Sequence, residues 1–141
     1  MAWLLDTNVL SELRRPNPHA SVVAFVATCP LHLLSISVVT VAEIRFGIDS
    51  QGDQIRRAVL NDWLTNKVRP MFDGRVLQIT EDTMLIWRQL VEEGRKIGHT
   101  FSQPDLIIAA TAVQHGLTVV TRDRSHFDKA RVPVFDPWNT V

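Results

Sequence analysis

Four acidic side chains in this sequence stand at places where chemistry is plausible. They are Asp6, Glu43, Asp105 and Asp123. Asp6 and Asp123 follow apolar runs typical of buried strands, whereas Glu43 and Asp105 fall in the first turns of predicted helices. Carboxylates in such apolar company are costly to desolvate unless they are paired, hydrogen-bonded or bound to cations. Because Mg²⁺ and Mn²⁺ prefer carboxylate oxygens and water, a pocket made only of acids points to one of these ions.

Each of these acids also has a purely structural explanation. Residues Thr40 to Glu43 fit a capping box, in which Glu43 would bond back to the backbone N–H of Thr40. Ser102 and Asp105 fit a looser form of that pattern, and the other two acids could be N-caps themselves. Capping is the simpler explanation for any acid taken alone. The four acids together, with their apolar flanks, favour a shared cation site.

The elements that must position these acids alternate along the chain. Strands are predicted at 2–5, 31–34, 76–79, 117–120 and 132–135, and helices at 8–14, 22–26, 40–48, 53–68, 80–98 and 106–115. This alternation predicts parallel crossover units and an α/β fold. The runs 3–5 and 117–120 are apolar throughout, which is typical of strands covered on both faces. Ligands of open parallel sheets bind beyond the carboxyl ends of the strands, so acids at those ends can converge.

Composition narrows the possible functions. A chain of 141 residues, 45 % hydrophobic and 21 % charged, suits one ordered domain over residues 1–141. Its net charge of zero is mild evidence against a nonspecific DNA coat protein. Cys29 is the only cysteine and the five histidines form no HxxxH or HExxH pair, so a zinc site is not expected. Without a signal-like or membrane-spanning run, the protein is expected to be cytoplasmic, with no membrane partner.

Basic and aromatic side chains could contact a nucleic acid. Candidate phosphate contacts are Arg14, Arg15, Arg45, Arg122 and Arg124, and candidate stacking residues are Trp3, Trp63, Trp87 and Trp138. Arg45 and Arg122 are preferred because they lie nearest the acids, although ordinary surface charge explains any one arginine equally well. Trp3 and Trp87 fit apolar patterns and are expected in the core or in a subunit interface.

Five ordered segments resemble the motifs of PIN-domain ribonucleases, and the VapC toxins, including FitB-like members, are the most similar subgroup. The segments are 4–10 (LLDTNVL), 37–47 (SVVTVAEIRFG), 105–112 (DLIIAATA), 119–123 (VVTRD) and 134–138 (VFDPW), and they span nearly the whole chain. The resemblance implies a PIN-like α/β/α sandwich with a central, mostly parallel sheet of four to five strands. One departure is Gln103-Pro104 before Asp105, where relatives often have small residues; altered cap geometry is expected there.

The resemblance also implies an activity, namely endonucleolytic hydrolysis of RNA with Mg²⁺ or Mn²⁺. The acidic site would be Asp6, Glu43, Asp105 and Asp123, with Thr7, Asn8 and Thr121 helping to hold it. Asp6, Asp105 and Asp123 would mainly bind metal, and the metal would activate a water molecule for attack on the phosphodiester. Whether Glu43 binds metal or orients the water stays open, as does the number of metal ions.

Partners and rival functions complete the expectations. VapC-like toxins imply a homodimer held inactive by a VapB-like antitoxin in a type II toxin–antitoxin pair, often with an antitoxin arginine reaching the carboxylates. A phosphatase with Asp6 as nucleophile is disfavoured because Asn8 stands where a second Asp is needed, and a receiver domain lacks its acidic pair before Asp6. The alternative from another class is a catalytically silent PIN-like module that acts through its antitoxin on DNA.

Overall fold

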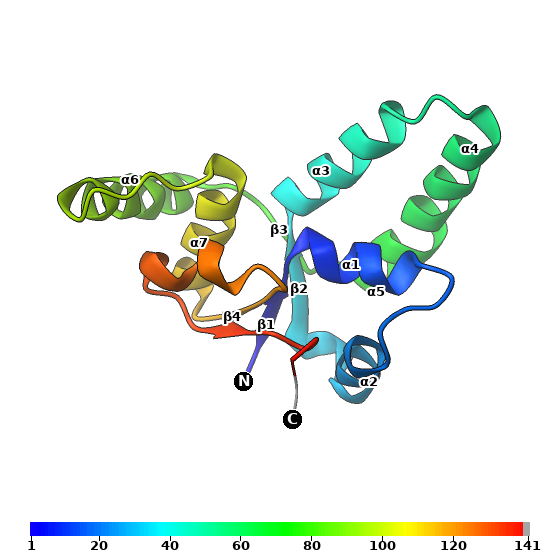
Figure 1. Cartoon of the computed structure of the whole chain (residues 1–141), viewed down its shortest axis with the longest axis horizontal. Helices are drawn as coiled ribbons and strands as arrows, with labels where there is room; N and C mark the ends of the chain where they lie inside the picture. The colour runs from blue at the N-terminus through cyan, green and yellow to red at the C-terminus, as the bar shows by residue number, and fades with distance from the viewer. Residues whose placement is uncertain (140–141) are drawn as a thin grey trace.

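A parallel sheet forms the centre of the protein in the computed structural model, which describes residues 1–139 (Figure 1). Within these residues the strands are β1 (Trp3–Leu5), β2 (Leu34–Ser37), β3 (Val76–Leu77), β4 (Thr118–Val120) and β5 (Val134–Phe135). Their order is β3-β2-β1-β4-β5 and each neighbouring pair is parallel. The first strand therefore lies in the middle, with Trp3 opposite both Leu34 and Thr118. This arrangement confirms the predicted α/β/α fold, and every described strand is parallel.

Helices cover both faces of the sheet. They are α1 (Thr7–Arg14), α2 (Ala20–Thr28), α3 (Val38–Asp49), α4 (Gln54–Trp63), α5 (Arg69–Met71), α6 (Glu81–Lys96) and α7 (Gln103–His115). In Figure 1, α6 and α7 lie on one side of the sheet and α1 to α5 on the other. Successive strand residues point to opposite faces. Leu4 accordingly packs in one buried cluster with Ile108 of α7, and Leu5 packs in a second cluster with Val9 of α1.

The start of α3 differs from the sequence prediction. Residues Leu31–Leu33 form a short 3-10 helix, and the second strand follows it instead of beginning at Leu31. Ser37, the last residue of β2, caps α3 by accepting a hydrogen bond from the backbone N–H of Val39 at 3.0 Å. Thr40 lies inside the helix and is fully buried, so the predicted capping box with Glu43 is wrong. Ser37 rather than Thr40 caps the helix because the chain turns from β2 into α3 at Ser37.

Two glycines shape the elements that lead to Asp105 and Asp123. Gly116 ends α7 with φ 66°, a left-handed conformation that glycine adopts without strain. A Cβ on Gly94 would lie 2.8 Å from the carbonyl oxygen of His99 and 2.9 Å from the Phe101 ring. Only glycine therefore lets α6 pack so closely against the segment that enters α7. The long helix α6 itself begins as predicted, with Thr80 as its cap.

The helices can be compared with membrane-spanning helices in length and hydropathy. None of the helices described in residues 1–139 combines the length and the apolar character that crossing a membrane requires.

Candidate active site

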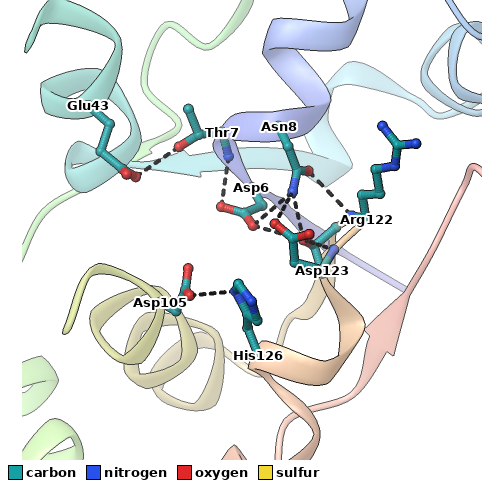
Figure 2. A network of polar contacts seen from close by, with 9 residues as sticks. Asp6, Thr7, Asn8, Glu43, Asp105, Arg122, Asp123 and His126 are labelled. Carbon is teal, nitrogen blue, oxygen red and sulfur yellow. Dashed lines mark hydrogen bonds and ion pairs between the residues drawn. The ribbon is translucent and has the colours of Figure 1, made fainter. Parts of the chain in front are cut away.

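The four predicted acids meet at the carboxyl edge of the sheet. Asp6 directly follows β1 and is the N-cap of α1, and Asp123 follows β4 just before a 3-10 helix, Arg124–His126. Glu43 is the sixth residue of α3 and Asp105 the third residue of α7. Figure 2 shows the four carboxylates pointing toward one common space. Residues that are as far apart as 117 positions in the chain come together because the parallel strands all end at this edge.

Asp6 is the most deeply buried of the four acids. Its side chain is 6 % exposed, and its carboxylate accepts hydrogen bonds from the Thr7 backbone N–H and the Thr121 hydroxyl, both at 2.8 Å. Burial raises the pKa of Asp6 from the ordinary 3.8 to about 6. The two hydrogen bonds oppose this shift, whereas the negative charges of Asp105 and Glu43 add to it. Asp105 and Glu43 are thus each close enough to Asp6 to disfavour its charged form.

Asn8 joins the ends of β1 and β4. Its side-chain amide donates to the Thr121 hydroxyl at 3.1 Å and to the Asp123 carboxylate at 3.2 Å, and it makes a longer contact of 3.5 Å with Asp6. The Asn8 carbonyl oxygen accepts from the backbone N–H of Arg122 at 3.4 Å. One asparagine therefore links the two acids that follow strands.

Thr7 links the strand end to α3. Its hydroxyl donates to the Glu43 carboxylate at 3.0 Å and lies 3.3 Å from the hydroxyl of Thr40. Glu43 is otherwise exposed to solvent. The Thr7 hydroxyl carries one proton, so it donates either to Glu43 or to the buried Thr40 hydroxyl, and Glu43 is the nearer acceptor.

His126 is a site residue that the sequence analysis missed. Its Nδ1 lies 2.9 Å from Oδ2 of Asp105, whose side chain is 19 % exposed. The predicted cap role of Asp105 is wrong, because Ser102 makes no side-chain cap bond and the Asp105 carboxylate turns to the histidine instead. No sequence spacing marks this histidine, although its position three residues after Asp123 could have drawn attention to it.

The predicted phosphate contacts differ in how they are placed. The Arg122 guanidinium lies 5.6 Å from the Trp138 ring centre, and in Figure 2 it points away from the carboxylates. Arg45 is exposed on α3, and within residues 1–139 its guanidinium has no hydrogen bond or ion pair. Arg15 and Arg124 form ion pairs with Glu12 and Asp128. The tryptophan of β1, predicted in the core, packs its ring against those of Phe25 and Phe135.

Trp138 is hydrogen-bonded to Glu12, a buried acid of α1. Its indole N–H donates to Glu12 at 3.3 Å, and Glu12 also accepts from the backbone N–H of His19 at 3.0 Å. The hydrogen bond from His19 is the main reason that the pKa of Glu12 is lowered. Through Trp138, this acid supports the position of Arg122 beside the site.

The ligand types of the site suit a hard divalent cation, but the side chains are not arranged to bind one. All four candidate ligands are carboxylates, the groups that Mg²⁺ and Mn²⁺ prefer. Within residues 1–139, however, no group of three His, Cys, Asp or Glu side chains is placed to hold a metal ion. Glu43 and Asp105 instead engage Thr7 and His126. The mutual repulsion that adds to the raised pKa of Asp6 is the kind of strain that a cation would relieve.

Comparisons with known proteins agree with this arrangement. The family model described as PIN domain matches residues 3–132, so the chain belongs to the PIN domain family. Within that family it is a member of the VapC toxin group. It is 40 % identical to "Toxin FitB" of Neisseria gonorrhoeae over 96 % of this chain and 98 % of that protein. It is 37 % identical to "VapC ribonuclease Y4jK" of Sinorhizobium fredii over 96 % of each chain.

Solved structures show the same fold. The structure titled "Crystal Structure of FitAcB from Neisseria gonorrhoeae" superposes with a TM-score of 0.93 at 40 % identity, covering 98 % of this chain and 99 % of that one. "Structure of FitAB bound to IR36 DNA fragment" also gives 0.93, at 38 % identity over 99 % and 97 % of the two chains. The sequence-based recognition of a PIN-domain, VapC-like chain is confirmed.

Proposed function

We propose that this protein is a Mg²⁺- or Mn²⁺-dependent endoribonuclease and the toxin of a type II toxin–antitoxin pair. The observation that carries the proposal is the meeting of four carboxylates at one sheet edge, with a buried Asp6 whose pKa is raised to about 6. A fold has little structural use for acids that repel one another. The relative named a VapC ribonuclease supports RNA as the substrate.

Asp6, Asp105 and Asp123 would hold the cation, and Glu43 is a fourth candidate ligand. A bound Mg²⁺ or Mn²⁺ would supply positive charge for the phosphate oxygens and make a water molecule more acidic. Asn8 and Thr121 keep Asp6 and Asp123 in place by direct hydrogen bonds. Glu43 is exposed and bonded only to Thr7, which leaves it able either to bind the cation or to orient the attacking water.

Hydrolysis needs groups that receive the phosphate as well as groups that hold the cation. Water would form a new bond to phosphorus while one P–O ester bond breaks, and the leaving oxygen would take up a proton. Arg45 lies two positions after Glu43 and Arg122 lies immediately before Asp123, and both would bind phosphates once the Arg122 guanidinium, which points away from the carboxylates, turns toward the bound strand. The stacking of Arg122 on Trp138 limits the conformations of that guanidinium.

Cleavage of a mixed cellular RNA with Mn²⁺ and with EDTA tests the proposal. We expect endonucleolytic products only with the metal, and none from Asp6→Ala or Asp105→Ala when circular dichroism shows a retained fold. Asp73→Ala removes an exposed aspartate from the loop before β3 and serves as the matched control. Wild-type levels of cleavage in both site variants would place the activity elsewhere. Sequencing the ends of the products would identify the RNA target.

A catalytically silent module acting through an antitoxin on DNA is the second candidate. It is favoured by one finding, namely that a relative was solved as a FitAB complex bound to a DNA fragment. Titration calorimetry with Mn²⁺ separates the two functions. The nuclease is expected to bind the ion saturably, whereas a silent module has no need to do so.

An antitoxin partner is proposed from the same relatives, which were solved as FitAB and VapBC complexes. Co-expression with the antitoxin should yield a complex that no longer cleaves RNA. A protein of this kind would act on RNA in the cytoplasm.

A homodimer is also proposed. Phe46 is 75 % exposed and Ile79 42 % exposed, and both line a shallow apolar depression together with Val39 and Ala42. A second copy covering this face would remove the apolar surface from water. Light scattering should show that the wild type is a dimer and that Phe46→Ser is a monomer. Ile97→Ser, which removes an exposed apolar residue after α6, should remain a dimer.

A further inference from the structure

A cavity between α1, α3 and α4 begins at the candidate active site and ends at basic side chains. Its volume is about 230 Å³, and Thr7 and Glu43 line the end that adjoins the acids. Arg14, Arg56 and Trp63 line the cavity as well. One space therefore extends from the Glu43 carboxylate of the site to two guanidinium groups.

Arg14 and Arg56 each precede another arginine in the sequence, and that second arginine makes a contact within the fold. Arg15 pairs with Glu12 at 3.4 Å, and Arg57 donates its Nε to the carbonyl oxygen of Gln51 at 3.0 Å. Arg14 and Arg56 are exposed, and within residues 1–139 neither guanidinium makes an ion pair or a hydrogen bond. In both pairs, one arginine stabilises the fold and the other is left with its donors free inside the cavity.

Trp63 gives Arg14 a defined place. The Arg14 guanidinium lies 5.8 Å from the centre of the Trp63 ring, within the range of a cation–π interaction. Stacking on an aromatic face leaves the edge N–H groups of a guanidinium free to donate. Trp63 therefore acts as a positioning residue for Arg14.

We propose that this cavity binds the RNA backbone next to the cleaved bond, with one phosphate on Arg14 and one on Arg56. This inference rests on the proposed action on RNA. Two unpaired guanidinium groups lining one cavity supply the charged donors that phosphate oxygens accept. The volume of about 230 Å³ is below the roughly 300–1,000 Å³ of pockets that enclose whole small molecules, which suits one part of a longer chain. A strand leaving the acids on this side would enter the cavity directly.

Binding of a fluorescein-labelled, mixed-sequence RNA 12-mer tests the proposal in EDTA, where cleavage does not interfere. Anisotropy titrations over a range of KCl concentrations give the affinity and the number of phosphates neutralised. For single strands, each phosphate contact contributes about 0.7 to the slope of log affinity against log salt. The double variant Arg14→Gln/Arg56→Gln should lower the slope by about 1.4 and the affinity by about tenfold or more.

Controls separate a local effect from a change in net charge and from unfolding. The double variant Arg88→Gln/Arg95→Gln removes the same two positive charges from α6, where both arginines pair with Glu92, and should bind RNA like the wild type. Trp63→Leu removes the ring that holds Arg14 and should lower the RNA affinity by less than the double variant does. Trp63→Phe keeps an aromatic ring and should bind RNA like the wild type. Thermal unfolding checks that each variant is folded.

Two outcomes are decisive. An unchanged affinity and salt slope in the folded double variant would overturn the proposal and leave the cavity to a protein partner. Cleavage with Mn²⁺ is scored separately. If the wild type binds RNA through these arginines but cleaves none, the proposed nuclease activity fails and the RNA subsite stands.

Discussion

The two acids that follow strands and the two that lie on helices are held in different ways. Asp6 and Asp123 share the amide of Asn8, and the hydroxyl of Thr121 bonds Asp6 directly. Glu43 and Asp105 instead have one side-chain partner each. The strand acids are joined to each other through Asn8, whose amide is the one side-chain partner of the Asp123 carboxylate among residues 1–139, whereas the helix acids are bonded to separate partners outside that pair.

This difference indicates how the site could be divided in function. A network with several mutual hydrogen bonds fixes side chains before any ligand arrives, and this lowers the cost of binding. A carboxylate with one exposed partner can change its rotamer when a cation or phosphate approaches. Such a division would explain why the described side chains converge on one space and yet form no finished metal site. The predictions below test it, from the largest expected effect to the smallest.

Asp6→Asn should stabilise the metal-free protein at neutral pH. Because the pKa of Asp6 is about 6 in the folded chain and near the ordinary 3.8 when unfolded, the folded state holds this proton more tightly. The free energy of unfolding of the wild type therefore falls as the pH rises between these two values. In EDTA at about pH 7.5, the variant should be more stable by roughly 1–3 kcal/mol in urea denaturation.

The gain should disappear at about pH 3.5, where Asp6 is protonated in both states of the wild type. With Mn²⁺ present, the wild type should gain stability and Asp6→Asn should not. Equal stabilities of the two proteins at every pH in EDTA would show that burial of this charge carries no cost.

Asn8→Ala should weaken the strand side of the site. Removing the amide leaves the Asp123 carboxylate without this donor and without its side-chain link to Asp6, although the Asp123 backbone N–H still bonds the Thr121 hydroxyl at 3.0 Å. Partners that orient metal-binding side chains typically account for about 10–100-fold in metal affinity, and we expect a loss of that size. Mn²⁺ calorimetry measures it, with Asn61→Ala, an exposed position on α4, as the matched control.

Thr7→Val should have a smaller effect, since Glu43 is the one acid that it frees, although it also removes the partner of the Thr40 hydroxyl. The variant keeps the shape of the side chain and removes the hydroxyl that donates at 3.0 Å. Losing one such bond corresponds to roughly 3–10-fold, which we expect in the rate of RNA cleavage. Thr7→Ser should retain the wild-type rate. A loss as large as that of Asn8→Ala would contradict the division between strand and helix acids.

His126→Ala should have the smallest effect. The histidine side chain is 53 % exposed, and an exposed ion pair contributes about 0–1 kcal/mol, so Mn²⁺ affinity should change by no more than about fivefold. His126→Gln, which retains a donor, should restore the wild-type value. If His126→Ala instead lowered Mn²⁺ affinity more than Asn8→Ala does, the contact that holds Asp105 would matter more than the one that holds Asp123. That result would contradict the division between strand and helix acids.

The sequence predicts the sheet edge of the site well, because the signals there are local. An apolar strand followed by Asp6, and another that leads to Asp123, give both the strand and the place of the acid. The parallel sheet then requires that these ends meet. Local patterns do not predict that the first strand lies in the middle of the sheet, because the strand order depends on pairing between segments far apart in the chain.

The helix side is predicted less well, because competing local patterns look alike. Ser37 and Thr40 are both good N-caps three residues apart, and only the end of β2 decides between them. The contact of His126 with Asp105 joins residues 21 positions apart through tertiary packing alone. The π-helical turn at Leu64–Val68 likewise has no sequence signal, although the predicted helix spans it.

The central place of β1 has a consequence for how the protein is made. Its partner β4 and the acid that follows it come more than 100 residues after β1, so a ribosome makes the segments that carry the other three acids before either exists. A truncated product carries three of the four carboxylates and lacks one neighbour of its middle strand. A proposed RNA-cutting toxin built this way would lack a complete acidic site until β4 and Asp123 have been synthesised.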